Sequence, residues 1–296
     1  MKTSLSRATL GIVWCACLWM GTASAAAAPA ALHVYTSGSM AGALAEIAAR
    51  YTQETGQAVE ITSGAAGLLR QRIEKGAGAD VYVSANLANA QHLAQDHLGS
   101  PAVIIARNSL CIIARSQLHL TADNLLETLS KPSVKIGTST PGADPGGDYA
   151  WAWFASLDAA HPGTGKVLRD KAQQLVGGAV APKVPAHISA VTWFLQQGRV
   201  DAFVSYCSSK QPNASPAPGL VKIAIPPQQS VPVNYAMSVL LRPGEPTRQI
   251  EAYRFANFLL TPDAQARLPR YGFIPVTGID AGNASATSDG AAGPDR

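Results

Sequence analysis

The fold is decided by residues 32–64, which have the sequence LHVYTSGSMAGALAEIAARYTQETGQAVEITSG. Leu32–Thr36 predicts one strand, and Ala58–Thr62 predicts a second. Between them, apolar residues recur at helical spacing up to Gly56: Met40, Leu44, Ile47, Ala48 and Tyr51. A helix between two short strands indicates a parallel βαβ unit, so we predict an α/β protein.

The same alternation extends along the chain. A second helix ends at Gly76, and Asp80–Ser84 is the next predicted strand. We expect the apolar run Ala102–Ala114 to carry the chain out of one sheet and into another. A second α/β series follows, with helices predicted at 122–129, from 146, at 167–175 and at 189–197, and strands at 134–138, 202–206 and 221–225. A strand at 235–241 and a helix at 247–260 complete the pattern.

The first 28 residues have the order of a secretory signal peptide. Lys2 and Arg7 precede an apolar run at 8–20, and small residues follow at 23–28. The run is shorter than the roughly 20 residues that span a bilayer, which argues against a transmembrane anchor. We therefore expect the leader to be cleaved and the mature protein to be periplasmic.

Composition excludes several classes of protein. The 296 residues are 47% hydrophobic and 14% charged, too apolar for a disordered chain and too long for a disulfide-stapled miniprotein. The formal charge of +4 falls to about +2 without Lys2 and Arg7, so we expect no nucleic-acid partner. After removal of the leader two cysteines remain, Cys111 and Cys207. The sequence leaves open a disulfide between them or two separate buried thiols.

Candidate binding groups lie in turns that follow predicted strands, because ligands of parallel α/β sheets bind beyond the carboxyl ends of the strands. Four such turns are small, neutral and rich in hydroxyl groups or glycine. In the first, YTSGSM at 35–40, Ser39 either caps the next helix or donates to an anion. In the second, TSGAAG at 62–67, only the backbone donates at Ala66.

The other two turns belong to the second α/β series. The segment PGADPGGD at 141–148 contains Gly146 and Gly147, where glycine allows close approach of the backbone to a ligand. The segment VSYCS at 204–208 presents the hydroxyl of Tyr206, which needs a partner when buried.

Patterns typical of enzymes and metal sites are missing from the sequence. The six histidines have no metal-ligand spacing, and Gly163–Lys166 is an incomplete phosphate loop followed by Val167. Ser39 lies outside a GxSxG elbow. We therefore predict no catalytic residue, no metal site and no cofactor.

Four segments carry a family resemblance. Thr36–Met40, Leu69–Ala85, Ala106–Leu110 and Arg270–Phe273 resemble the periplasmic molybdate-binding proteins of ABC transporters, and the similarity runs from about Leu32 to Phe273. The long segment Gly137–Trp151 is more elaborate than the usual turn of that family, which indicates a divergent branch.

The resemblance implies a two-lobed periplasmic binding protein clamp, each lobe a mostly parallel sheet flanked by helices, joined by crossover strands. It places lobe 1 at 29–108 plus 236–276 and lobe 2 at 109–235, and we expect a disordered tail at 277–296. Hinge motion is expected near Asn108 and Tyr235.

The resemblance also implies the binding residues: Ser39, Ala66, Gly146, Ile188 and Tyr206, to which we add the neighbouring amide of Gly147. The second serine of the family falls on Ala66, so one side-chain hydrogen bond is lost there. A carboxylate at Asp148 would repel a dianion, so we expect it to cap its own helix and point away from the cleft.

The function implied is that of the solute-binding component of an ABC importer. A tetrahedral oxyanion, molybdate or tungstate, would be bound through neutral donors from both lobes, and the closed monomer would dock on an inner-membrane permease. Another anion, such as sulfate, phosphate or a small organic acid, is the first alternative. A secreted hydrolase that uses Ser39 is the second.

Overall fold

A computed structural model describes residues 30–185 and 188–276. The predicted signal peptide and the predicted tail lie outside these residues. Within the described part of the chain, no helix combines the length and apolar character needed to cross a membrane.

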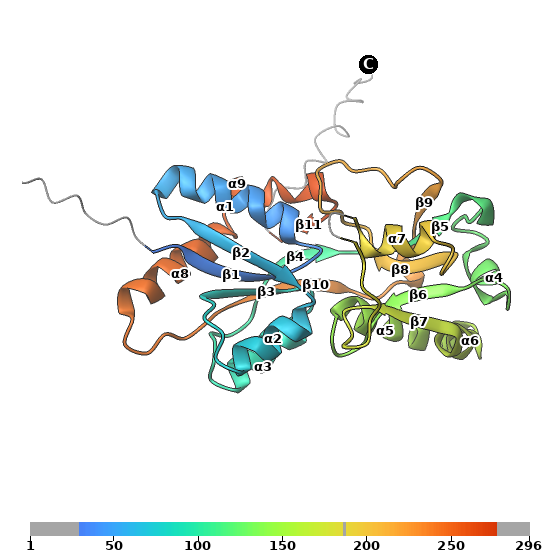
Figure 1. Ribbon diagram of the computed structural model, residues 1–296, viewed down its shortest axis with the longest axis horizontal. Helices are drawn as coiled ribbons and strands as arrows, with labels where there is room; N and C mark the ends of the chain where they lie inside the picture. Colours follow the sequence, from blue (N-terminus) through green and yellow to red (C-terminus); the bar gives the residue numbers. More distant parts are fainter. Residues whose placement is uncertain (1–29, 186–187, 277–296) are drawn as a thin grey trace, which may run out of the picture.

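Two sheets lie side by side along the long axis of the molecule, and each forms a lobe with its own helices (Figure 1). Lobe 1 is built on a six-stranded sheet in the order β11-β4-β10-β3-β1-β2. Its strands are β1 (Leu32–Ser37), β2 (Val59–Gly64), β3 (Val81–Ser84), β4 (Val103–Asn108), β10 (Val233–Val239) and β11 (Ile274–Pro275). Its helices are α1 (Ala41–Thr55), α2 (Ala66–Glu74), α3 (Leu87–Gln95), α8 (Pro246–Phe258) and α9 (Pro262–Gln265), and the turn η3 (Leu268–Tyr271) precedes β11.

Lobe 2 is built on a five-stranded sheet in the order β7-β6-β8-β5-β9. Its strands are β5 (Leu110–Arg115), β6 (Ile136–Ser139), β7 (Ala172–Val176), β8 (Ala202–Tyr206) and β9 (Leu220–Ala224). Its helices are α4 (Leu125–Ser130), α5 (Pro145–Ala160), α6 (Thr164–Lys171) and α7 (Ala190–Gln196), with short 3₁₀ turns η1 (Ser116–Leu118) and η2 (Pro227–Gln229). Helices cover both faces of each sheet (Figure 1). The predicted two-lobed α/β clamp is therefore confirmed.

The strands that cross between the lobes make both sheets mixed rather than mostly parallel. The run 102–114 divides into β4 and β5, which meet at Ser109 and belong to different sheets. The chain returns between β9 and β10. β4 and β10 pair antiparallel with each other, and β5 pairs antiparallel with β8 and β9, so parallel pairing is confined to β1, β2 and β3 in one lobe and β6, β7 and β8 in the other.

The helix predicted at 167–175 is wrong in its second half. The helix α6 ends at Lys171, and Ala172–Val176 forms β7, which pairs with β6 at the edge of the sheet. The polar pair Gln173 and Gln174 hides the alternation of a strand, while the spacing of Val167, Leu168 and Leu175 also fits a helix. Pairing with β6 decides the structure, because it satisfies the backbone groups of this segment.

A buried carboxylate links distant segments of lobe 1. Asp80, just before β3, is fully buried and accepts from the Arg248 guanidinium at 2.7 Å and from the backbone N–H of His33 at 2.7 Å. Arg242 lies 3.2 Å away. Because Arg248 belongs to α8, the cluster joins the first strands of the chain to its C-terminal helices.

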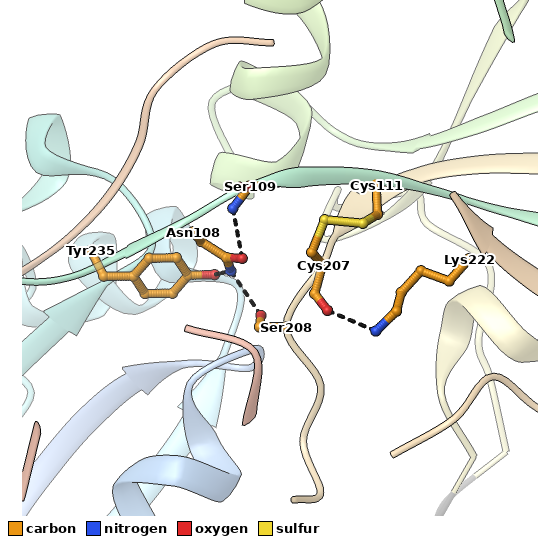
Figure 2. The surroundings of a disulfide bond; sticks show 7 residues. All are labelled: Asn108, Ser109, Cys111, Cys207, Ser208, Lys222 and Tyr235. Carbon is orange, nitrogen blue, oxygen red and sulfur yellow. Dashed lines mark hydrogen bonds between the residues drawn. A yellow bond between two sulfur atoms is a disulfide. The ribbon is translucent and has the colours of Figure 1, made fainter. Parts of the chain in front are cut away.

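Lobe 2 is fastened by a disulfide between Cys111 in β5 and Cys207, which follows β8 (Figure 2). The Cα atoms are 4.9 Å apart although the residues are separated by 96 positions in sequence. Of the two alternatives that the sequence left open, the structure shows the disulfide. It holds the chain that directly follows Tyr206 against the crossover strand β5.

Candidate functional site

Three tyrosines from three elements meet where the lobes join. Tyr149 lies in α5, Tyr206 ends β8 and Tyr235 lies in the crossover strand β10. The ring centroid of Tyr206 is 5.7 Å from that of Tyr235 and 6.3 Å from that of Tyr149, and both pairs are edge-to-face. We call these three residues the tyrosine cluster, and the candidate site is described from them outward.

The hydroxyl of Tyr235 joins lobe 1 to the crossover region. It lies 2.8 Å from Ser39 Oγ and accepts from Asn108 Nδ2 at 3.4 Å. The same amide donates to Ser208 Oγ at 2.8 Å (Figure 2). Burial raises the pKa of Tyr235 well above its usual range, so the phenol stays protonated. From the sequence, Asn108 and Tyr235 were expected only as hinge positions. The polar hydroxyl of a tyrosine inside an apolar strand was the signal that Tyr235 needs a hydrogen-bond partner.

Ser39 does not cap the helix that follows it. The N-cap of α1 is Met40, which makes no side-chain capping bond, and the Ser39 hydroxyl instead faces Tyr235. The capping alternative for Ser39 is therefore wrong. Its hydroxyl is partly exposed and contacts only other hydroxyl groups within the described chain: Tyr235 at 2.8 Å and, more weakly, Ser37 at 3.5 Å.

The hydroxyl oxygen of Tyr206 is buried and has no hydrogen-bond partner among the described residues. Burial raises the pKa of Tyr206 well above its usual range, and Tyr235, Asp144 and Asp148 act in the same direction. The hydroxyl is therefore a protonated donor that lies near groups of both lobes. A buried donor without an acceptor lowers the stability of the fold by roughly 1–3 kcal/mol, and a ligand atom that accepts its hydrogen bond would remove this cost.

The amides of Gly146 and Gly147 are engaged within the chain. Asp144 is the N-cap of α5; its Oδ1 accepts from the N–H of Gly146 at 2.9 Å, and its carbonyl accepts from the N–H of Gly147 at 2.9 Å. A Cβ on Gly147 would lie 2.4 Å from the nitrogen of Pro141, so this glycine serves the close approach of α5 to the preceding turn. The role of both amides toward a ligand stays a prediction, and it requires displacement of these bonds.

Asp144 contributes a carboxyl group to which the sequence pattern assigned no role. Burial is the main cause that raises the pKa of Asp144 to about 6, and the negative charge of Asp148 adds to it, while the bonds from Gly146 and Ser139 oppose it. A cap two residues before glycine, in the pattern Asp-Pro-Gly, was the available signal.

Asp148 does not cap its own helix in the way we expected. The cap is Asp144, while Asp148 lies in the first turn of α5 and accepts from the N–H of Gly142 at 2.7 Å. Its second oxygen accepts from Asn86 Nδ2 at 3.3 Å. Since Asn86 belongs to lobe 1, Asp148 faces the opposite lobe rather than pointing away from it. The tight turn at 141–143 that leads into α5 explains the difference, because it leaves Gly142 within reach of Asp148 and Gly146 within reach of Asp144.

Ala66 is the first residue of α2 and is buried. The N-cap, Ala65, makes no side-chain bond, so the first turn of α2 has no polar side chain to satisfy its amides. The carbonyl of Ala66 accepts from the Tyr82 hydroxyl at 2.7 Å, which fixes this end of the helix on β3.

The two lobes touch at the first turn of α2. A Cβ on Gly67 would lie 2.4 Å from the carbonyl oxygen of Gly142 and 2.7 Å from that of Ala143. A Cβ on Gly177 would lie 2.6 Å from Cβ of Asp144 and 3.3 Å from Cβ of Ala65. The N-termini of α2 and α5 therefore approach each other where the lobes meet, and the absence of a side chain at Gly67 permits the contact.

Ile188 lies directly before Ser189, the N-cap of α7, and is partly buried. Its predicted role as an amide donor stays a prediction. The structure thus places Ser39 and Tyr206 beside the same residue, Tyr235, and places Ala66 and Gly146 in the two helix turns that approach each other.

Other features of the surface lie away from this site. Open hollows beside α4 and between α1 and α8 contain none of the site residues. Glu74, His92 and Asp96 gather their ligand atoms within 4.8 Å, but all three are exposed and Glu74 also pairs with Arg70. Exposed charged side chains often form such clusters without a metal, so we assign no metal to these three residues.

Residues 32–274 match the family of bacterial extracellular solute-binding proteins. The chain is also 33% identical over 219 residues to an uncharacterized protein of Pasteurella multocida (strain Pm70), covering 73% of this chain and 87% of that protein.

Solved structures of low identity share the fold. The periplasmic molybdate-binding protein of Azotobacter vinelandii has a TM-score of 0.64 at 19% identity, covering 82% of this chain and 98% of that one. A periplasmic thiamin-binding protein has a TM-score of 0.66 at 14% identity, covering 84% of both chains. Proteins that share this fold bind very different solutes, so the identity of the solute has to be inferred from the residues of the candidate site.

Proposed function

The chain belongs to the family of bacterial extracellular solute-binding proteins, and we propose that it is the periplasmic component of an ABC importer whose solute is a tetrahedral oxyanion, molybdate or tungstate. In this proposal the mature protein is a monomer, it delivers the anion to an inner-membrane permease, and it has no cofactor and catalyses no reaction. The disulfide in lobe 2 supports export, because such bonds persist in oxidising compartments.

The observation that carries the proposal is the Tyr206 hydroxyl, a buried donor without a partner among the described residues. Two further donors lie close to the same junction: the Ser39 hydroxyl and the uncapped first turn of α2 at Ala66. A helix N-terminus favours an anion through its amides and its dipole. One anion between the lobes would accept from all of them.

Neutral donors are sufficient to hold an anion. Each charge-assisted hydrogen bond contributes roughly 1.5–3 kcal/mol, so several together replace the lost hydration without lysine or arginine. Discrimination would then depend on size, because an anion smaller than molybdate leaves some of these donors unreached.

Contacts between the lobes support a clamp that closes on its solute. Asn86 of lobe 1 bonds to Asp148 of lobe 2, and the first turn of α2 rests on the carbonyl groups of Gly142 and Ala143. Contacts of this kind form only when the lobes approach, so a bound anion would favour the closed state by bridging them. X-ray scattering with and without molybdate tests this step: we expect a smaller radius of gyration with molybdate, and an unchanged radius would contradict closure.

The environment of Ser39 argues against the hydrolase alternative. A serine nucleophile needs a base in hydrogen-bond contact, whereas the partners of the Ser39 hydroxyl within the described chain are the hydroxyls of Tyr235 and Ser37. A phenol whose pKa is raised by burial does not accept the proton that a nucleophile must lose.

The proposal is tested by thermal shift and calorimetry of the mature protein with molybdate, tungstate, sulfate and phosphate. We expect molybdate and tungstate to raise Tm strongly and to bind more tightly than sulfate. Ser39→Ala should weaken molybdate binding about ten- to a hundredfold with the fold intact. Ser156→Ala is the matched control, since that hydroxyl donates to a carbonyl inside α5. If no oxyanion changes Tm or gives heat of binding, the proposed function is wrong.

A further inference from the structure

Two carboxyl groups lie at the place where the anion is proposed to bind. Asp144 caps α5 and Asp148 lies in its first turn. Their hydrogen-bond partners are donors without charge: the amides of Gly146 and Gly142, the hydroxyl of Ser139 and the side chain of Asn86. No arginine or lysine of the described residues lies within ion-pair distance of either carboxyl. This wall of the cleft is therefore acidic.

Asp144 lies at the junction of the lobes. Its Cβ and that of Ala65 both lie within 3.3 Å of the position that a Cβ on Gly177 would take. Ala65 is the N-cap residue of α2 and makes no side-chain capping bond. The first turn of α2 that follows it is one of the proposed donor groups. A solute held at that helix end therefore lies beside Asp144.

The two oxygens of Asp144 differ in their surroundings. Oδ1 accepts from the N–H of Gly146, whereas Oδ2 lies toward Gly177, and a Cβ there would be 3.3 Å from it. Oδ2 is therefore the oxygen that is able to carry a proton while the helix cap through Oδ1 is kept. A protonated carboxyl donates one hydrogen bond, and an ionised one only accepts.

Among the titratable groups that face Asp144, the negative charge of Asp148 in the first turn of α5 favours its protonated form. Tyr206 of β8 and Tyr235 of β10 also face Asp144, but both phenols are neutral and neither supplies a positive charge. β6 contributes the neutral Ser139. Burial raises the pKa of Asp144 to about 6, so uptake of a proton is accessible near neutral pH.

We infer that Asp144 is protonated in the solute-bound form and donates from Oδ2 to an oxygen of the anion, so that this cleft takes up one proton with each oxyanion. The inference rests on the proposed function and adds a specificity residue to it. An ionised Asp144 would repel a dianion, while a protonated Asp144 becomes one more neutral donor. The solute class is thus an oxyanion that shares a proton with the protein.

The experiment is calorimetry with molybdate between pH 6 and pH 8.5, repeated at each pH in buffers of different ionisation enthalpy to count protons. Molybdate keeps both negative charges over this range, so any proton taken up is bound by the protein. For the wild type at pH 8 we expect uptake of about one proton and an affinity that falls about tenfold for each further pH unit.

Asp144→Asn preserves the cap, because asparagine is an equally good N-cap, but it has no titrating group. We expect this variant to bind molybdate without proton uptake and with an affinity independent of pH. Asp158→Asn is the matched control: Asp158 lies in the same helix and accepts from the N–H of Gly165 at 2.8 Å, and its variant should keep the wild-type uptake and slope.

Two kinds of failure are distinguishable. Binding of molybdate by the wild type without proton uptake overturns the inference and leaves the proposed function standing, as does uptake that persists in Asp144→Asn. Absence of binding by every oxyanion tested overturns the proposed function itself, and the inference with it.

Discussion

The N-termini of α2 and α5 approach each other where the lobes meet, yet their first turns are capped differently. α2 begins after Ala65, which makes no side-chain capping bond. α5 begins after Asp144, whose carboxylate accepts from the N–H of Gly146, and the first turn of α5 also contains Asp148. Both helix ends favour a negative charge through their dipoles. In α5 the protein supplies that charge itself, while α2 leaves its end without one.

This difference between the N-termini of α2 and α5 indicates that the two lobes would contribute different groups to the proposed site. In the proposed site, lobe 1 would offer two donors, the Ser39 hydroxyl and the first turn of α2. Lobe 2 would offer one donor, the Tyr206 hydroxyl, beside the acids Asp144 and Asp148. Two unit charges of like sign 4 Å apart repel by about 4 kcal/mol at an effective dielectric constant of 20, more than one charge-assisted hydrogen bond returns. A dianion and an ionised Asp144 are therefore poorly compatible.

The largest expected effect concerns what holds the wall of lobe 2 in place. Replacing both Cys111 and Cys207 by serine removes a crosslink between residues 96 positions apart and should lower the free energy of unfolding by about 4–5 kcal/mol. Urea denaturation of the variant and of the reduced wild type measures it. Equal midpoints for the oxidised and reduced protein would contradict the role of the disulfide in stability.

The acid in the wall of lobe 2 should itself cost stability at alkaline pH. The folded-state pKa of Asp144, about 6, exceeds the ordinary value of 3.8, so the penalty is present above pH 6 and is lost as the pH falls from 6 toward 3.8. Asp144→Asn should therefore be more stable than the wild type by about 2–3 kcal/mol at pH 8, and equally stable near pH 4. Denaturation at both pH values measures the difference; Asp158→Asn, which should gain nothing at pH 8, is the control.

The contact between the two walls is open to a test at Gly67. In Gly67→Ala the new Cβ would meet the backbone oxygens of Gly142 and Ala143, which are not able to move aside as a side chain would, so the lobes must stay further apart. We expect molybdate affinity to fall at least tenfold, about 1.4 kcal/mol, by calorimetry. Gly78→Ala, where the nearest atom is the end of the Arg242 side chain at 3.7 Å, should bind as the wild type does. Equal affinity in the two variants would mean that binding does not require this contact.

A last pair of variants distinguishes a hydroxyl that binds the ligand from a hydroxyl that stabilises the fold. Tyr206→Phe should weaken molybdate binding by about 1–3 kcal/mol without loss of stability, because its hydroxyl has no partner among the described residues. Tyr82→Phe should do the reverse and lose about 1 kcal/mol of stability, because it removes a buried hydrogen bond to the carbonyl of Ala66. Calorimetry and urea denaturation on both variants check this; a loss of stability in Tyr206→Phe would contradict the assignment.

Most elements of the fold are predictable from the sequence because hydrophobic spacing repeats clearly in Leu32–Gly64 and in the run that became β4 and β5. The strand β7 is not, since Gln173 and Gln174 lack the alternation and pairing with β6 decides their structure. The disulfide is not predictable either, because only the pairing of β5 with β8 brings Cys111 and Cys207 together.

The candidate site is predictable where it follows the ends of strands. That rule selected Ser39 and Tyr206, and the structure places both beside Tyr235. It did not find Tyr235, whose hydroxyl becomes significant only when the folded chain brings it to Ser39, which follows β1, and to Asn108 at the end of β4. The expectation that Asp148 points away from the cleft rested on charge repulsion and was wrong, because the folded chain brings the N–H of Gly142 and the side chain of Asn86 to its carboxylate.

The most direct test of the account is a crystal structure of the mature protein with tungstate, in which anomalous scattering locates the metal atom without ambiguity. The account predicts the anion between the lobes, with oxygens within about 3.2 Å of the Ser39 and Tyr206 hydroxyls and of Asp144 Oδ2. Tungstate held instead by arginine or lysine side chains, or found outside the cleft, would contradict it.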